Sequence, residues 1–550
     1  MRRNRWGTAA AAVAAAIAIA GCGRAADEGG TAARTTEATA QDALALDPTT
    51  PPATGDVDAI TWATYRPVQT IDPIQAFDYP DNTAVTLLCE SLLRQHPDGS
   101  IVDGLATASH PDDTTLVLEI KEGATFWDGS PVTAEDAVYS LKRNMDERLA
   151  GFYGSVFARV ESIEATGERE VTIRLEQPDT WLEGELSQMP GVVVQKAYAE
   201  RQGKRFGTPA GGTMCTGAMK LDAWTGGDAL VAVRNDDYWG ERPSSVGRVE
   251  LRGVPDDANL TNGLLTGEID GTYLAGPLAT ADQLKASGEV TLYEGPSYAT
   301  DALVVSAAEG PLADVRVRQA LSKAIDRRAY IASAYKGTAL LPRTLANPGT
   351  WGYGRDVFQA DWDRLPEPEL DVEAGRRLVE GAGATGQTIT IGMTEEIPNL
   401  ATVAQVVRTA AEAIGLKVKL KAVSAANYIN FFVDPKAWSS VDAFPTVNYP
   451  DYADPAAFYA TFALPGGSQN YSGYENPRVT ELLEEARTTA DPQRRAELVA
   501  EAGDVLAEEL PWIPIVAPAT VLIMSNEITG APASFSYMGA PWADTIGAKG

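Results

Sequence analysis

Residues 121–143 read KEGATFWDGSPVTAEDAVYSLKR, and they predict a strand end, a tight turn and a helix in succession. The Asp128-Gly129 pair favours the turn, because Asp can hydrogen-bond its own backbone and Gly tolerates positive φ. Thr133 is a good helix N-cap, and Asp136 lies where an acid interacts favourably with the positive end of the helix dipole. The stretch therefore predicts a strand–turn–helix unit.

Helices and strands alternate along the rest of the folded chain. Apolar residues recur at helical spacing in some segments and alternate with polar residues in others. Gly415 follows one helical stripe as an expected C-terminal cap, and Asp491-Pro492 breaks another helical segment. The pattern predicts an α/β fold with a mixed sheet. The predicted helices are 81–93, 313–335, 403–414 and two within 476–510, and the predicted strands are 59–65, 116–120, 416–420 and 513–524.

The N-terminus has the features of a secretory signal. Residues 1–21 combine three Arg with an apolar run, Ala9–Ala20, that is too short to span a bilayer. The run ends in Ile19-Ala20-Gly21-Cys22, which resembles the lipobox of bacterial lipoproteins, whose cysteine is freed by cleavage and lipidated. The resemblance predicts a lipidated Cys22 and a protein anchored to the outer face of the cell membrane. An ordinary signal peptide with an incidental Cys is the alternative.

The segment after the signal predicts a tether. Residues 22–57 consist mainly of small, polar and acidic residues and nearly lack large apolar side chains. Such a segment cannot bury enough surface to offset its ordering entropy. We therefore expect a disordered tether over 22–57 and a folded body from residue 58.

Composition narrows the function classes. The 550-residue chain has a formal net charge of −30, and removal of the signal, with its three Arg, takes this near −33. This acidity argues against a nucleic-acid partner, because phosphate neutralisation needs a basic surface. The only histidines are His96 and His110, so we expect neither a metal site nor a cofactor. Cys89 and Cys215 either form a disulfide or stay as two buried thiols, and the sequence leaves both open.

Residues 121–143 resemble the signature region of the extracellular solute-binding protein family 5, the peptide-, dipeptide- and nickel-binding proteins of ABC importers. The resemblance extends over nearly the whole chain after the signal, in family order. Its blocks are residues 92–106 with the signature at 121–143, then 216–239, 267–270, 314–327 and 476–514.

The resemblance implies a two-lobed periplasmic-binding-protein-like fold (class II type, cluster C) with an extra α/β subdomain in the first lobe. Two crossovers would join the α/β lobes, and hinge closure would trap a ligand between them. The implied division is lobe I at 58–93, 198–300 and 515–550, the extra subdomain at 94–197, and lobe II at 301–514.

A segment rich in acids, aromatic rings and prolines, residues 448–459, is the candidate ligand contact. Rings supply apolar area and an acid anchors a cation, although a surface turn is the alternative from the residues alone. In peptide-binding family members, an acid in such a segment pairs with the α-ammonium of the ligand. The resemblance implies that Asp451 is this anchor, with Asp454 as runner-up. It also implies ligand contacts on exposed strand edges at Ala63, Thr64 and Tyr65 and at Val447, Asn448 and Tyr449, and a pocket role for Tyr273, for which packing is the alternative.

The leading hypothesis is a lipid-anchored, monomeric receptor that captures short peptides and delivers them to the transmembrane subunits of an ABC permease. The same scaffold could instead bind a non-peptide solute: an oligosaccharide, a metal chelate or an opine-like compound. An enzyme is disfavoured, because no Gly-x-Ser-x-Gly motif occurs and both His lie in predicted turns or loops. The sequence does not separate nutrient uptake from signalling.

Overall fold

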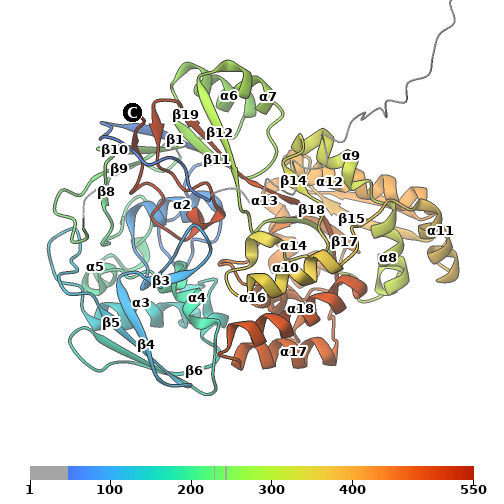
Figure 1. The fold of residues 1–550 in the computed structure, drawn as a ribbon, viewed down its shortest axis with the longest axis horizontal. Coiled ribbons are helices and arrows are strands. Elements are labelled where there is room, and N and C mark those ends of the chain that lie inside the picture. Colours follow the sequence, from blue (N-terminus) through green and yellow to red (C-terminus); the bar gives the residue numbers. More distant parts are fainter. Residues whose placement is uncertain (1–47, 228, 242–243) are drawn as a thin grey trace, which may run out of the picture. The chain divides into compact units, whose positions relative to one another are not determined.

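The computed structural model describes residues 48–227, 229–241 and 244–550. Two large mixed sheets and a smaller antiparallel sheet organise this part of the chain (Figure 1). The predicted signal over 1–21 and the lipidation at Cys22 lie outside the described residues. The α/β fold class is confirmed.

The first sheet has seven strands and defines lobe I. Its central strand β1 pairs in parallel with both neighbours, whereas the remaining pairs are antiparallel. In order across the sheet, the strands are β12 (Val290–Gly295), β19 (Thr520–Ser525), β11 (Gly271–Leu274), β1 (Ile60–Thr64), β10 (Arg248–Gly253), β9 (Ala229–Arg234) and β8 (Met219–Trp224).

The second sheet has six strands and defines lobe II. In order they are β14 (Ala339–Leu340), β18 (Trp512–Pro518), β13 (Thr300–Val305), β17 (Ala443–Asn448), β15 (Thr388–Met393) and β16 (Lys417–Ala422). The principal helices of lobe II are α8 (Val315–Ala324), α10 (Arg355–Arg364), α11 (Val372–Gly381), α12 (Pro398–Ala413), α16 (Pro455–Ala463), α17 (Pro477–Thr488) and α18 (Pro492–Glu509). Figure 1 shows α17 and α18 side by side.

A third, four-stranded antiparallel sheet forms the subdomain. Its strands, in order, are β4 (Ala106–Asp112), β5 (Thr115–Ile120), β7 (Glu170–Leu175) and β6 (Val160–Ala165). Helices α3 (Ala134–Asn144), α4 (Leu182–Leu186) and α5 (Lys196–Gln202) accompany it, and α2 (Tyr79–Leu88), α6 (Asp257–Thr266) and α7 (Ala281–Ser287) belong to lobe I. Two short strand pairs complete the described sheets, β2 (Leu93–Gln95) with β3 (Ile101–Asp103) and β20 (Ile528–Thr529) with β21 (Gly547–Ala548).

The signature stretch folds as its residues predict. Gly129 has a φ of +79°, and the Phe126 amide donates to the Ser130 carbonyl across the turn (2.9 Å). Thr133 caps α3, with reciprocal hydrogen bonds between Thr133 and Asp136. The predicted strand–turn–helix unit is confirmed.

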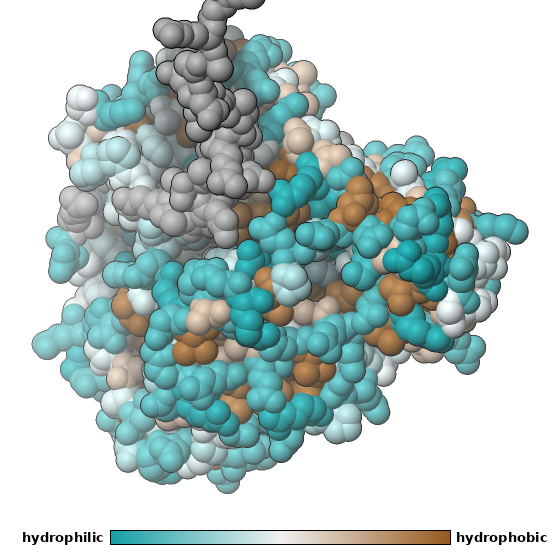
Figure 2. Space-filling view, turned by 45° about the vertical axis from the view of Figure 1, so that its right-hand side comes forward, coloured by the Kyte–Doolittle hydropathy of each residue, from teal (hydrophilic) through white to brown (hydrophobic). Residues whose placement is uncertain are grey.

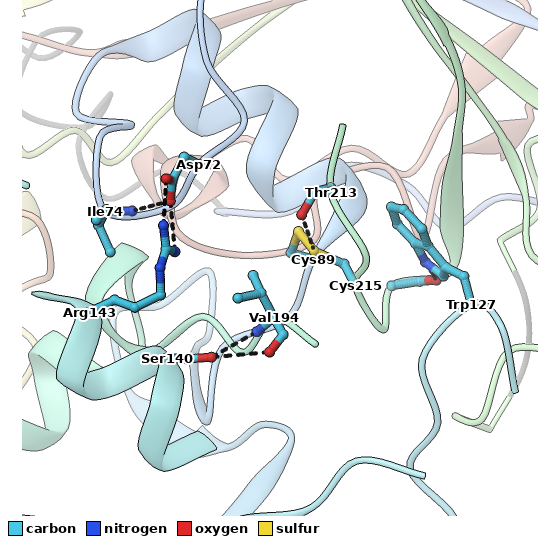
Figure 3. Close-up of a disulfide and its surroundings, with 10 residues drawn as sticks. Asp72, Ile74, Cys89, Trp127, Ser140, Arg143, Val194, Thr213 and Cys215 are labelled. Atoms are coloured by element: carbon cyan, nitrogen blue, oxygen red, sulfur yellow. Dashed lines mark hydrogen bonds and ion pairs between the residues drawn. A yellow bond between two sulfur atoms is a disulfide. The ribbon is translucent and has the colours of Figure 1, made fainter. Parts of the chain in front are cut away.

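The signature stretch also fastens the subdomain to lobe I (Figure 3). Arg143 of α3 donates to both carboxylate oxygens of Asp72, at 2.9 and 2.7 Å, and both side chains are buried. The Trp127 indole donates to the Gly217 carbonyl (3.2 Å). The Trp127 amide donates to the carbonyl of Cys215, which forms a disulfide with Cys89 at the end of α2. The Arg143–Asp72 ion pair, the Trp127 hydrogen bonds and the Cys89–Cys215 disulfide therefore connect the subdomain with lobe I.

Three predicted boundaries are wrong. The helix predicted over 81–93 is α2, which ends at Leu88, and Leu93 already belongs to β2. The helix predicted over 313–335 ends at Ala324, because Asp326 caps a new short helix, α9 (Arg327–Tyr330), by accepting from the Ala329 amide (3.0 Å). The apolar run 513–524 is not one strand. It forms β18 and β19 in different sheets, and Pro518 ends β18 where a missing backbone donor suits a strand end. The predicted break between two helices at Asp491-Pro492 is confirmed, as is Gly415 beyond the end of α12.

The predicted tether is too long at its C-terminal end. Residues 48–57 run beside the C-terminal segment, where the Thr50 hydroxyl donates to the Ala531 carbonyl (2.8 Å) and the Thr54 amide to Ala548 (2.9 Å). Backbone and hydroxyl hydrogen bonds hold this stretch in place. The prediction failed because it considered only apolar side chains, which the stretch nearly lacks. The remaining lobe boundaries stay a proposal, although sheet membership places the return to lobe I at Ala519 rather than at 515.

Apolar side chains concentrate inside the lobes. In lobe I, Trp62 of β1 packs on Trp542 with ring centroids 4.6 Å apart, and in lobe II, Phe462 stacks on Trp512 at 5.1 Å. The face drawn in Figure 2 is mostly hydrophilic, with hydrophobic side chains in separate patches. Within the described ranges, no helix has the length and apolarity that a membrane crossing requires.

We predict that the Cys89→Ala/Cys215→Ala double variant is less stable by about 4–5 kcal/mol, because the disulfide closes a loop with a sequence separation of 126 residues. Urea unfolding followed by circular dichroism measures the loss. Wild type unfolded in reducing buffer is the matched control and should behave like the variant. Coincident unfolding curves for variant and oxidised wild type would contradict this expectation.

Candidate ligand-binding cleft

Two adjacent crossovers join the sheets of lobe I and lobe II. The first runs from β12 to β13 through residues 296–299, and the second from β18 to β19 through Ala519. Gly295 pairs with Thr520 at the lobe I side, and Asp301 pairs with Val516 at the lobe II side. The Thr520 hydroxyl also donates to the Pro296 carbonyl (2.8 Å). The lobes are therefore connected by an antiparallel pair of strands that continues from one sheet into the other.

A pocket lies at these crossovers. The space between its walls is about 730 Å³, including the part that is open solvent, and the walls come from both lobes. Lobe I contributes Tyr79, Phe535 and Tyr537 to the lining, and lobe II contributes Asp301 and Val447. Ala519 of the second crossover also lines the pocket. A ligand in this pocket would contact the two lobes and the strands that connect them.

Tyr449 brings lobe II against lobe I beside the pocket. Its ring centroid lies 5.3 Å from that of Tyr79 and 4.9 Å from that of Phe535. The Tyr79 and Phe535 rings contact each other edge-on at 5.9 Å. The predicted contact residue Tyr449 therefore takes part in an aromatic cluster that spans the cleft.

The Asp451 carboxylate is half-buried and lacks a partner. In the described part of the chain, neither a hydrogen-bond donor nor a cation pairs with it. Burial raises its pKa to about 6. An acid held in this way can accept a cation from a ligand, since a buried charge is stabilised only by pairing.

Glu185 of α4 faces the same region from the subdomain. One oxygen, Oε2, is buried without a hydrogen-bond partner in the described part of the chain. Burial and the charge of Asp451 hold the pKa of Glu185 well above its ordinary value. Gly184 explains the close approach, because a Cβ there would come within 2.1 Å of the Tyr452 ring. The sequence gives no signal for Glu185, which lies in a five-residue helix far from residues 448–459.

Asp454 is already engaged in the fold. It caps α16 by accepting from the Ala456 amide (2.8 Å), and it accepts from the Tyr353 hydroxyl (3.0 Å). Burial raises its pKa. These bonds leave Asp454 less free than Asp451 to receive a ligand.

On one side, the predicted strand edge on lobe II pairs with another strand only at Ala443, and farther along it Pro445 lacks an N–H and its carbonyl accepts from the Tyr428 hydroxyl. β17 pairs with β13 along its whole length but with β15 only at Ala443. Val447 and Asn448 lie at the far end of this edge and are half-buried, and the Asn448 side-chain Nδ2 donates to Gln469 Oε1 (2.8 Å). Within the described sheets, an added strand could pair with β17 here.

The predicted contacts on lobe I lie on and just beyond a central strand, not at an edge of the sheet. β1 is central, so the carbonyls of Ala63 and Thr64 already accept from the Thr272 hydroxyl (3.0 Å) and the Val254 amide (2.7 Å). Tyr65, beyond the end of β1, is 43% exposed. Only the end of this segment is therefore open to a ligand.

Tyr273 packs in the core of lobe I. Its ring stacks on Tyr537 with centroids 3.6 Å apart, and its hydroxyl donates to the Pro532 carbonyl (2.8 Å). Of the predicted contacts on this side, Val447 lines the pocket and Tyr449 packs on two rings that line it. Asn448 and Asp451 are not among the lining residues, and Tyr273 lies behind Tyr537.

Contacts between the subdomain and lobe II close the cleft on one side. Arg487 of α17 donates to Asp179 (Nε to Oδ1, 2.8 Å), and its guanidinium lies 4.4 Å from the centre of the Trp181 ring. Arg159 forms a second ion pair with Glu484. We call these two ion pairs the cleft contacts.

The sequence of this chain is similar to known proteins over most of its length. The family described as bacterial extracellular solute-binding proteins, family 5 Middle, matches residues 100–470. The periplasmic oligopeptide-binding protein OppA of Salmonella typhimurium is 25% identical over 469 residues, which cover 82% of this chain and 85% of OppA.

Solved structures show the same two-lobed fold. The periplasmic binding protein DppA from Helicobacter pylori, in complex with the peptide STSA, matches with a TM-score of 0.77 and 20% identity, covering 90% of this chain and 99% of DppA. AgaA from A. tumefaciens R10, in complex with agropinic acid, matches with the same TM-score, identity and coverage.

We predict that Arg487→Ala opens the cleft. The change removes a partly buried ion pair and a cation–π contact, a loss of about 3 kcal/mol, which is comparable to the free energies that separate open and closed states. Small-angle X-ray scattering of the ligand-free protein should give a larger radius of gyration than for wild type. Arg478→Ala, which removes exposed ion pairs with Glu481 of the same helix and with Glu501 of α18, should not change it. Equal radii for wild type and Arg487→Ala would argue against the role of the cleft contacts.

Proposed function

Because the chain belongs to the bacterial extracellular solute-binding proteins of family 5, we propose that it captures short peptides between its lobes and delivers them to the permease of an ABC importer. Members of this family are binding proteins rather than enzymes. The ligands of the relatives support a peptide substrate, since OppA is an oligopeptide-binding protein and DppA holds the peptide STSA.

The observation that carries the proposal is the unpaired carboxylate of Asp451. An α-ammonium supplies the positive charge and the three N–H donors that the carboxylate lacks. The unpaired edge of β17 ends at Asn448, so a peptide anchored at Asp451 would run along this edge as an added strand. Tyr65 would meet it from lobe I, and Asp454 would support the loop through the cap of α16.

The finer points of the proposal concern location and assembly. The lipobox-like Ile19-Ala20-Gly21-Cys22 supports lipidation at Cys22 and anchoring to the outer face of the cell membrane. The receptor acts as a monomer, with the transmembrane subunits of a permease and the membrane as its partners. The proposed division is lobe I, subdomain and lobe II, with the tether shortened to residues 22–47.

A non-peptide solute is the second candidate. AgaA, a structural neighbour, was solved with agropinic acid, and NikA from Staphylococcus aureus, at a TM-score of 0.72, with Ni(L-His)2. Both neighbours share the fold but have low sequence identity with this chain, so the fold does not distinguish a peptide from a non-peptide ligand. The residues that contact the ligand decide between the two.

We predict that Asp451→Asn weakens peptide binding at least about 30-fold, because a buried ammonium would lose its charged partner. Isothermal calorimetry on residues 48–550 with a pool of di- to pentapeptides measures the effect. The same pool N-acetylated should not bind wild type. Glu380→Gln, an exposed acid of α11, is the matched control.

Binding that survives both acetylation and Asp451→Asn would place the anchor elsewhere. If the wild-type protein binds neither pool, the peptide proposal is wrong, and sugars and metal chelates become the next ligands to test.

Peptide affinity should also depend on pH. With an Asp451 pKa of about 6 in the empty protein, the carboxylate is ionised above this pH and loses its charge below it. Affinity should therefore be full near pH 7.5 and fall by about tenfold at pH 5, where about nine-tenths of this group is protonated. Glu185, Asp179 and Arg487 lie in the same electrostatic environment, so Glu185→Gln should move the midpoint. A pH-independent affinity between 5 and 7.5 would contradict the role of Asp451.

A further inference from the structure

A further unsatisfied acid, Asp301, lies on the wall of the pocket. It is the second residue of β13, directly after the first crossover, and its side chain is 0% exposed. Its Oδ2 accepts from the hydroxyls of Tyr335 (2.6 Å) and Tyr330 (3.3 Å). Its Oδ1 is buried and has no hydrogen-bond partner in the described part of the chain.

No cation of the described chain compensates Asp301. Three other charged side chains line the pocket: Lys285, Glu294 and Lys336. Lys285 is paired with Glu294 at 2.9 Å, and Lys336 is exposed to solvent. Desolvation of the buried carboxyl raises its pKa to about 7. The pocket therefore has an acidic end whose charge the protein itself does not pair.

The contrast with Asp72 shows that a structural role does not explain Asp301. Asp72 is also buried, and each of its oxygens accepts from the guanidinium of Arg143. A buried acid that only supports a fold is satisfied in this manner, because a missing partner costs free energy. Asp301 bears this cost beside a pocket, which is the arrangement expected when the missing partner arrives with a ligand.

Aromatic rings complete the environment of a cation. Tyr79, Phe535 and Tyr537 line the same pocket as Asp301. The faces of such rings attract an ammonium or guanidinium group, and the attraction grows when the group is desolvated. Rings and a carboxylate together form a site for a long cationic side chain, which has an apolar stem and a charged end.

The location of Asp301 connects it with the proposed ligand. Asp301 pairs in register with Val447 of β17, the strand whose other edge is free and whose end leads to Asp451. Resting on the proposed function, we propose that Asp301 and the three rings form a subsite for a lysine- or arginine-like side chain near the N-terminus of the peptide. The receptor would then select cationic peptides, using Asp451 for the α-ammonium and Asp301 for the side chain.

The test compares tripeptides of Ala in which one residue is Lys or norleucine, its uncharged near-isostere, at each of the three positions. Calorimetry at pH 8 should show that wild type binds one Lys peptide at least about tenfold more tightly than its norleucine counterpart. Asp301→Asn should remove this preference and leave the affinity for the norleucine peptide unchanged. Glu380→Gln should retain the preference.

Thermal unfolding of the same variants checks that Asp301→Asn remains folded and that the acid is not structural. The pKa of Asp301 is about 7 in the folded chain against an ordinary value of 3.8, so its ionisation lowers the free energy of unfolding progressively between about pH 4 and pH 7, fully above pH 7, and not at all below about pH 4. Asp301→Asn should therefore raise the unfolding midpoint at pH 8 and leave it unchanged at pH 4.

The outcomes separate this inference from the proposed function. If wild type binds Lys and norleucine peptides equally at every position, or if Asp301→Asn keeps the preference, the cationic subsite is wrong and the peptide receptor stands. If wild type binds none of the tripeptides, both proposals are overturned. A lower unfolding midpoint for Asp301→Asn at pH 8 would assign the acid to the fold and also overturn the subsite.

Discussion

The pairing of two antiparallel crossovers is the constraint on which the rest of the structure depends. β12 and β19 leave the lobe I sheet together and continue as β13 and β18 in the lobe II sheet, with a single residue, Ala519, in the second crossover. Because each crossover is held to the other, the lobes can change their angle more easily than they can slide or separate. The pocket, the aromatic cluster around Tyr449 and Asp301 all lie at or beside this joint.

The structure uses buried acids in two different ways. Asp72 and Asp454 are satisfied, one by a guanidinium and the other by a helix N-terminus and a tyrosine, and they hold the subdomain and α16 in place. In the described chain, one oxygen of Asp301 has no hydrogen-bond partner, and half-buried Asp451 has neither a donor nor a cation beside it. Asp301 lines the pocket between the lobes, and Asp451 lies in the segment that follows β17. Unsatisfied groups reduce stability, and the proposed ligand would supply the missing charges when the lobes close.

Local sequence signals predicted the elements better than their assembly. The capping of α3 by Thr133, the break at Asp491-Pro492 and Gly415 after α12 depend on neighbouring residues and could be read directly. The division of 513–524 between two sheets could not, because apolar periodicity is the same on both sides of Ala519. Asp451 was found through a family resemblance, whereas Glu185 and Asp301 become visible only when α4 and β13 are placed in space. A single acid in a short helix or a buried strand belongs to no sequence pattern from which a ligand site could be predicted.

The central claim is that the lobes close on peptides with a free N-terminus, and native mass spectrometry tests it most directly. Residues 48–550, unfolded and refolded to release any bound molecule, would be mixed with a protein digest and freed of unbound material before measurement. The account predicts retained peptides, identifiable after release, and no retention from the same digest after acetylation of its amines. Equal retention from the acetylated digest, or no retained peptide from either, would contradict it.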